Sequence, residues 1–449
     1  MYLVNDIIIF LFILVLIYNL YKNKYGNAII VSMVAYFIMP VLKIGEAGIN
    51  SAYVITGVIG IWMFCNIISK KEGFNKLEII YITGSCLSIA VIALSWILQK
   101  NYAASHIIHF MGAVQYVLGI LSLSVLYKKA SNDDIKYIIK KSIEIAVAWN
   151  FVIVILQMFT AKAGIVITKM LYTYPGKDAA ISVTAENGRF LRAFGAFYSP
   201  TMTGGFCLLV LAVIFVFVLA DVKWKNGLAV LFMTLFVGLF AFSKAVIIGV
   251  FLLWGVSIFM LLLLKRHLKF KRAGVILAEI LLAFLLVGII GNSIDLSGQV
   301  RYYFGKVFSP FSSFETRYGS SETENKKPGG SVKVEKEEGN LERTIEVIKE
   351  NPIIGVGPAA VEGEFVGDSQ YIVSLHDGGV VNLLIYILMY FTFFVYAWKT
   401  KNIYKIIIIF TIAVEGVFIP VFSGAFAIPF VAVLLLDNGA KKKDLQEAD

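Results

Sequence analysis

Long apolar runs, separated by short charged segments, constrain this chain more than any other feature. A bilayer core is about 30 Å thick, and an α-helix needs roughly 20 apolar residues to cross it. Hydrophobic residues make up 59% of the 449 residues and charged residues only 16%, and the mean hydropathy is +0.80. A soluble domain of this length does not bury so much apolar surface. We therefore expect an all-α polytopic membrane protein.

Thirteen runs are candidate spans, and the last two are short enough to form a single re-entrant hairpin instead. No Lys or Arg precedes the first run and no cleavage motif follows it, so we expect a retained helix there. The candidate spans are residues 3–21, 27–43, 52–69, 78–98, 103–127, 138–161, 199–219, 226–242, 245–264, 273–293, 378–398, 404–421 and 424–437.

The lysines predict the orientation of these spans. Alternate loops, together with the C-terminal tail, carry most of the lysines, and the short loops between them carry only Lys43, Lys100 and Lys244. Cytoplasmic loops are enriched in Lys and Arg, so the lysine-rich loops and the C-terminus are predicted to be cytoplasmic. The N-terminus and two long loops, 162–198 and 294–377, then lie outside. The net charge of +10 follows from this topology and from contact with anionic lipid, and it does not imply nucleic acid.

The chain divides by composition into six segments. These are N-terminal helices 1–161, a first outer loop 162–198, central helices 199–293, a large outer loop 294–377, C-terminal helices 378–437 and a tail 438–449. Residues 318–340 are polar and rich in Gly and charge, which is typical of a flexible linker. The sequence also predicts a short interfacial helix over 164–174, a helix that begins at Asn340 and ends before Asn351-Pro352, and a helix start at Ser199-Pro200.

Arginine is used unevenly, because five of the seven arginines fall in the two outer loops. A guanidinium keeps its charge and binds two phosphate oxygens at once, which lysine cannot do. We interpret the outer arginines as ligands for a phosphate-bearing substrate. The alternative is salt bridges to the many acids of the large loop. The five are Arg189, Arg192, Arg301, Arg317 and Arg343.

Three regions of the chain, residues 192–200, 243–244 and 343–379, carry motifs that resemble the O-antigen polymerase and O-antigen ligase superfamily. The run from Arg192 to Pro200 (RAFGAFYSP) is similar to its R-x-x-G-x-F-x-N/S-P segment, and Ser243-Lys244 resembles its Ser-Arg pair. Arg343 followed by NPIIGVG (351–357) is similar to its R…P-h-h-G-h-G block, where h is apolar. The run from Asp368 to Tyr371 and Asp377-Gly378-Gly379 resemble its closing (H/D)-N-x-Y…E-x-G block. The resemblance covers roughly residues 145–395.

This resemblance implies a GT-C-like fold and glycosyl transfer from a polyprenyl-pyrophosphate donor. The implied pyrophosphate ligands are Arg192, Arg343, Arg189, Arg301 and Lys244, which would stabilise charge on the leaving group. Candidate catalytic bases for the acceptor hydroxyl are Asp368, His376 and Asp377. The chain has Asp368 where the ligase branch has histidine, and an acid there is closer to the polymerase branch. No metal-ligand cluster is evident in the sequence, and we expect neither a metal nor a cofactor.

Two acids interrupt apolar spans, where an acid costs about 2.5–3.5 kcal/mol at the helix centre. Glu415 is a candidate for binding glycan or an arginine, or for a structural pairing, and Tyr371 is a second glycan-binding candidate. Glu279 is the other intramembrane acid. His106 and His109 share a helix face, but two histidines alone make a poor metal site. The three cysteines all lie in predicted spans, so no external disulfide framework is expected.

We therefore expect a polysaccharide polymerase on the outer face of a bacterial cytoplasmic membrane. Its substrate would be a polyprenyl-pyrophosphate-linked oligosaccharide repeat, and a chain-length regulator protein is a possible partner. An O-antigen ligase and a repeat-unit flippase are the alternatives. The sequence shows no internal repeat of the kind that transporters often have. From Arg343 to Gly379 the large loop is expected to fold back and meet Arg192.

Overall fold

The computed structural model describes most of the helical part of the chain. It describes residues 3–38, 40–44, 47–69, 73–99, 104–130, 132–160, 162–173, 185–186, 189–197, 199–220, 224–264, 268–294, 340–358, 369–418 and 424–437. The proposed linker 318–340, apart from Asn340, and the sites assigned to Arg301, Arg317 and Asp368 lie outside these residues.

Helices dominate the described residues, and two small hairpins accompany them. The helices are α1 (Leu3–Tyr21), α2 (Tyr25–Ile38), α3 (Ser51–Ile68), α4 (Lys76–Gln99), α5 (Ala104–Lys128), α6 (Asn132–Phe159), α7 (Lys162–Leu171), α9 (Pro200–Leu219), α10 (Gly227–Phe240), α11 (Lys244–Leu263), α12 (Phe270–Ser293), α15 (Asn340–Glu350), α16 (Gln370–Lys399), α17 (Ile403–Phe418), the 3-10 turn η2 (Ala425–Ala427) and α18 (Ile428–Leu434). The strands are β1 (Leu42–Ile44), β2 (Ala47–Ile49), β3 (Ala185–Glu186) and β4 (Arg189–Phe190), and they pair antiparallel as β1–β2 and β3–β4.

Within the described residues, nine helices are long and apolar enough to cross a membrane. This confirms the expectation of an all-α polytopic membrane protein. Each of the thirteen candidate runs contains a helix, although α2 and α10 have 14 residues each, α18 has seven, and the end of the 27–43 run lies in strand β1. The predicted helix from Asn340 is α15, and α7 covers most of the predicted 164–174 segment, whose interfacial location stays a prediction.

Helix α9 forms the centre of the bundle. Its residues are apolar on nearly every side, which is typical of a helix buried in a protein core or in a membrane. Its whole spanning window is buried. Ser199 caps its start by accepting a hydrogen bond from the Met202 amide at 3.2 Å, and Pro200 follows in the first turn. The predicted helix start at Ser199-Pro200 is therefore correct.

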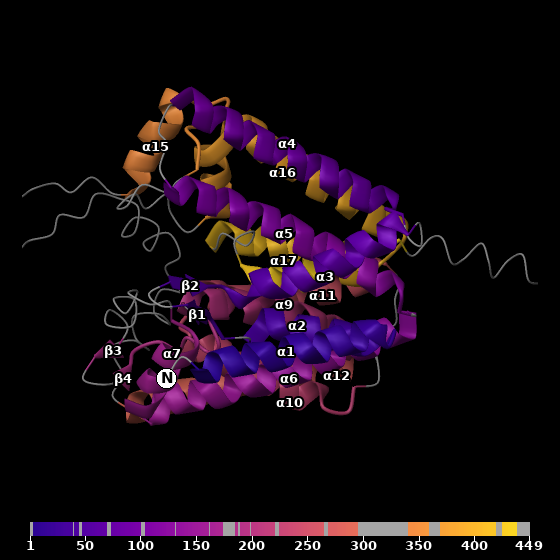
Figure 1. The fold of residues 1–449 in the computed structure, drawn as a ribbon. Coiled ribbons are helices and arrows are strands. Elements are labelled where there is room, and N and C mark those ends of the chain that lie inside the picture. The colour runs from indigo at the N-terminus through magenta and orange to yellow at the C-terminus, as the bar shows by residue number, and fades with distance from the viewer. Residues whose placement is uncertain are drawn as a thin grey trace, which may run out of the picture.

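The elements expected outside the membrane gather at one end of the bundle (Figure 1), where α1 also starts, close to α7 and the two hairpins. There the last carbonyls of α7 are satisfied by three donors. Lys43 Nζ binds the Lys169 carbonyl at 2.6 Å, and the Asn5 amide binds that of Met170 at 2.7 Å. The backbone amide of Val41 donates a hydrogen bond to the carbonyl of Leu171 at 2.8 Å. Orphan carbonyls at a helix end need such partners, so these bonds fix α7 against α1 and β1.

Candidate functional site

Helix α16 is broken at Gly378-Gly379, and the loop after α15 fills the break. Gly378 (φ −141°) and Gly379 (φ 63°) have non-helical backbone angles inside α16. In a regular helix the amides of Val380 and Val381 would bind the carbonyls of His376 and Asp377. Here those two amides donate instead to Pro352 at 2.9 Å and Ile353 at 3.1 Å.

The two carbonyls that the break releases also find partners in the same loop. The Val356 amide donates to the His376 carbonyl at 2.8 Å, and the Gly357 amide donates to the Asp377 carbonyl at 3.2 Å. The NPIIGVG segment thus replaces the missing hydrogen bonds of α16. Two motifs that are separate blocks in the sequence thus form one structural unit.

Two glycines allow this close approach. Gly355 has a φ of 71°, and a Cβ on it would lie 2.6 Å from the Gly379 nitrogen and 2.7 Å from the Gly378 nitrogen. A Cβ on Gly379 would in turn collide with the Ile353 backbone. L-residues with a side chain rarely adopt a positive φ, and neither position has room for one. The glycines of both motifs are therefore required by the backbone.

This unit holds His376 and Asp377 side by side. The imidazole Nδ1 lies 2.9 Å from the Asp377 carboxylate oxygen Oδ1, and the two residues are only 5% and 2% exposed. A carboxylate accepts hydrogen bonds, so Nδ1 carries the proton in this pair and Nε2 is the basic nitrogen. Such an arrangement is that of a general base oriented by an acid.

Two polar side chains, Asn382 of α16 and Ser88 of α4, stabilise the break in α16. Asn382 is buried, and its side-chain amide donates to the Ser374 carbonyl at 3.2 Å. Ser88 of α4 donates to the Asn382 side-chain oxygen at 2.6 Å. The Ser374 carbonyl belongs to the turn just before the break, where the regular i+4 donor would be Gly378. These bonds link the kink to α4.

Tyr371 and Ser369 attach the start of α16 to the end of α17. The Tyr371 hydroxyl donates to the Ala413 carbonyl at 2.7 Å, and the Ser369 hydroxyl donates to that of Gly416 at 3.0 Å. A mainly apolar cavity of about 260 Å³ lies between α16 and α17, next to this junction. Gln370, Tyr371 and Ser374 line its polar end, and aromatic and aliphatic side chains line the rest. The apolar lining comprises Leu383, Tyr386, Ile387, Tyr390, Phe391, Phe394, Ile409, Ile412, Ala413 and Gly416.

The Arg192 motif forms a second, separate unit, which α6 holds in place. The side-chain oxygen of Gln157 accepts hydrogen bonds from the amides of Phe194 (2.9 Å) and Gly195 (3.0 Å). The side-chain oxygen of Asn150 accepts a hydrogen bond from the backbone amide of Ala196 at 2.8 Å. Gly195 has a φ of 55°, and a Cβ there would lie 2.6 Å from the Asn150 oxygen. The loop backbone is therefore clamped by two buried amides of α6.

Arg192 connects this loop to the turn between α10 and α11. Its Nε donates to the Ala241 carbonyl at 3.1 Å, and one terminal nitrogen donates to the Phe242 carbonyl at 3.3 Å. Ser243 and Lys244 follow directly, and Lys244 is the first residue of α11. Ser243 packs onto Gly204 of α9 so closely that a Cβ on that glycine would collide with it. The structure thus brings the Arg192 motif and the Ser243-Lys244 pair together.

These groups place positive charge at a helix start. Arg192 and Lys244 flank the N-terminus of α11, where the backbone amides and the helix dipole favour an anion. Ser243 is the N-cap residue, but its side chain makes no capping hydrogen bond. Chemically, this arrangement suits a phosphate oxygen.

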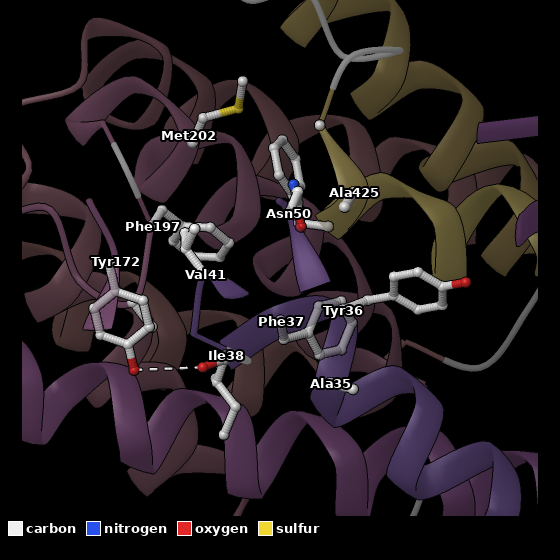
Figure 2. Close-up of a pocket in the computed structure, with 13 residues that line it drawn as sticks. Ala35, Tyr36, Phe37, Ile38, Val41, Asn50, Tyr172, Phe197, Met202 and Ala425 are labelled. Carbon is white, nitrogen blue, oxygen red and sulfur yellow. Dashed lines mark hydrogen bonds between the residues drawn. The ribbon is translucent and has the colours of Figure 1, made fainter. Parts of the chain in front are cut away.

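The cavity next to the Arg192 loop is too small for a sugar. Figure 2 shows it between the end of α2, Tyr172, Phe197 and Ala425. Its volume is about 50 Å³, which has room for only a few water molecules. The Tyr172 hydroxyl donates to the Ile38 carbonyl at 3.3 Å and accepts from the Trp149 indole at 2.6 Å. Burial raises the pKa of Tyr172, so this phenol stays protonated.

Glu415 lies in the core of the bundle. Its side chain is 0% exposed, and neither carboxylate oxygen makes a hydrogen bond to a described residue. A glycan could reach it only after the surrounding helices had moved. Glu279 of α12 is half-buried, and its Oε2 is likewise without a hydrogen bond to a described residue.

Several predicted ligands remain without described side chains. The backbones of Arg189 and Arg343 lie in β4 and α15, but their side chains, like those of His106 and His109, are outside the described part. The elements that carry the two units lie at the same end of the bundle (Figure 1). The expected contact between the Arg343–Gly379 segment and Arg192 stays a prediction.

Sequence reasoning missed the residues that support both units. Gln157 and Asn150 hold the Arg192 loop, and Asn382 and Ser88 hold the kink. One signal was available, because Asn150 and Gln157 are amides seven residues apart in an apolar span and so share a helix face. Among the described residues, no group of three or more His, Cys, Asp and Glu residues is arranged to hold a metal ion.

Comparisons with known proteins do not assign the chain to a family. No protein-family model matches the sequence, and no curated protein matches it.

Proposed function

We propose that this protein is a polysaccharide polymerase of the O-antigen polymerase and ligase type. It would transfer a polyprenyl-pyrophosphate-linked glycan chain onto a lipid-linked repeat unit outside the cytoplasmic membrane. One observation carries the proposal: NPIIGVG completes the broken hydrogen-bond ladder of α16 around the His376–Asp377 pair. Two resembling motifs thereby support a base that glycosyl transfer requires.

The chemistry assigns a role to each unit. His376 Nε2 would take the proton of the acceptor hydroxyl, while Asp377 holds the imidazole in the correct tautomer. The acceptor oxygen would bond to the anomeric carbon of the donor, and the bond from that carbon to the pyrophosphate oxygen would break. Arg192, Lys244 and the outer arginines would stabilise the charge left on the pyrophosphate.

The cavity between α16 and α17 suits the lipid part of the substrate. Its walls are aromatic and aliphatic, and Gln370, Tyr371 and Ser374 line its polar end, in the first turns of α16 that also carry His376. An apolar chain gains free energy by leaving water for such a surface. The polyprenyl tail would lie there, with the sugar toward the outer end.

The orientation supports an external reaction. The lysine-rich loops predict a cytoplasmic end, and α15 and the start of α16 lie at the opposite end. An external transferase needs a lipid-linked donor, since nucleotide sugars are cytoplasmic substrates.

A cellular test separates this function from its alternatives. Arg192→Ala and Arg343→Ala variants should lose long polymer while single-repeat glycans still reach the surface. Loss of the single-repeat product as well would indicate a flippase. Polymer that accumulates on the polyprenyl carrier, without transfer to its final anchor, would indicate a ligase.

A further inference from the structure

A second, larger cavity lies at the lysine-rich end of the bundle. Its volume is about 590 Å³, and α6, α9, α11, α17 and α18 contribute to its walls. Thr400 to Lys405 border it, whereas the His376–Asp377 pair is near the other end of α16. The cavity is therefore separate from the proposed catalytic pair.

The cavity has a basic, polar rim and apolar walls. Lys136, Lys401 and Asn402 form part of the rim, and both of these lysines are exposed at the surface. Phe217 and Leu261 are among the apolar wall residues. No acidic side chain is among its described lining residues. This polarity matches an amphiphile with a negatively charged head.

Lys405 also lines the cavity, but it stabilises the wall. Its side chain is 2% exposed, and its ammonium donates to the carbonyl of Leu434 at 2.9 Å and to that of Leu436. A cation at a helix C-terminus binds the last carbonyls of that helix, here α18. Lys136 and Lys401 line the exposed rim of the cavity, where an incoming anion would meet them.

We propose that this cavity binds an anionic phospholipid of the inner leaflet, with its phosphate between Lys136 and Lys401 and its acyl chains along Phe217 and Leu261. Basic pockets between helices on the cytoplasmic side suit anionic head groups, because that leaflet is negatively charged. The volume falls within the range of about 300–1,000 Å³ that is usual for ligand sites. Lys140 adds positive potential nearby, since its ammonium lies 5.7 Å from the Phe217 ring centroid.

A titration of the full-length protein in neutral detergent tests this site. Native mass spectrometry would measure the apparent dissociation constant of phosphatidylglycerol for the wild type and for Lys136→Gln/Lys401→Gln. A matched control is Lys22→Gln/Lys24→Gln, which removes two exposed lysines from the turn between α1 and α2. The rim variant should bind about 30-fold more weakly, roughly fivefold for each lysine, and the control should bind like the wild type.

Three results would overturn the proposal. The rim variant could bind phosphatidylglycerol as tightly as the wild type, or zwitterionic phosphatidylcholine could bind equally well. Full competition by sn-glycerol 3-phosphate would show that the site takes a free phosphate and not a lipid. If the rim variant does not fold, Leu261→Trp provides the test, because it fills the apolar part and leaves the lysines. It should weaken phosphatidylglycerol binding, and unchanged binding would contradict the assignment.

Discussion

The amide of Val356 donates a 2.8 Å hydrogen bond to the carbonyl of His376. The two residues come from a loop after α15 and from the middle of a broken helix. The bond replaces one that α16 loses at Gly378-Gly379, and three similar bonds complete the exchange. The position of the His376–Asp377 pair therefore depends on a segment about twenty residues earlier in the chain.

This dependence predicts that the glycines at the junction cannot be replaced. Gly379→Ala and Gly355→Ala should each destabilise the protein by at least about 2 kcal/mol, because both have a positive φ and both abut backbone atoms. Thermal unfolding in detergent would measure the loss. Gly288→Ala is the control, since a Cβ there meets nothing within 4 Å and alanine favours a helix. Equal thermal midpoints for Gly379→Ala and the control would contradict the observed junction.

The His376–Asp377 pair predicts a specific pattern of activity loss. His376→Gln should lower the polymerisation rate by about 10²–10⁴-fold, because the substitution removes the proposed general base. Asp377→Asn should lower it by about 10²-fold or more, since the imidazole would lose its orientation. Asp134→Asn, an exposed acid at the start of α6, should retain activity. Full activity in His376→Gln would assign the base elsewhere, for which Asp368 is the next candidate.

Arg192 has a structural role as well as a proposed catalytic one. Its two bonds to the carbonyls of Ala241 and Phe242 predict that Arg192→Lys lowers thermal stability, because an ammonium cannot bind both in the same geometry. If Arg192 also binds pyrophosphate, the KM for the lipid-linked donor should rise. A loss of stability with an unchanged KM would limit Arg192 to holding the loop.

Lys244 offers a cleaner test of anion binding, because it stands at the first position of α11. Lys244→Ala should raise the donor KM roughly tenfold, as expected for the loss of one charge-assisted bond. Lys244→Arg should restore or improve affinity. An equal KM in all three proteins would exclude Lys244 from the donor site.

Replacing Gln157 should lower thermal stability strongly, although the sequence did not single this residue out. Gln157→Leu leaves the amides of Phe194 and Gly195 without their acceptor, at about 1–3 kcal/mol each. Thermal unfolding should therefore show a clear loss. Gln115→Leu, which removes a single 3.2 Å bond to Thr56, should show a smaller one. Similar losses in both variants would argue against the clamp.

Apolar periodicity and capping predicted most of the elements. Length and hydropathy located the spans, Ser199-Pro200 located the start of α9, and Asn351-Pro352 located the end of α15. These signals are local, so a single sequence carries them. The bonds between residues 352–357 and 376–381 are non-local, and no pattern in the chain announces that a helix will break and be completed by another segment.

The candidate site was predictable only in part for the same reason. His376 and Asp377 were candidates by type, but their pairing at 2.9 Å depends on the kink. The supporting amides Asn150 and Asn382 were not singled out, because polar residues inside spans have many uses; only the seven-residue spacing of Asn150 and Gln157 was a usable signal. Glu415 was expected inside a span, but the sequence could not show that protein would cover it completely, because burial depends on which helices pack around α17.

Reconstitution with a lipid-linked oligosaccharide tests the central claim most directly. Purified protein in liposomes would be incubated with a polyprenyl-pyrophosphate repeat unit, and the products would be separated by size. The wild type should give a ladder of repeats, and His376→Gln, at the same protein level and thermal midpoint, should leave only the single repeat. A ladder from His376→Gln, or none from folded wild-type protein supplied with its own repeat unit, would contradict the account.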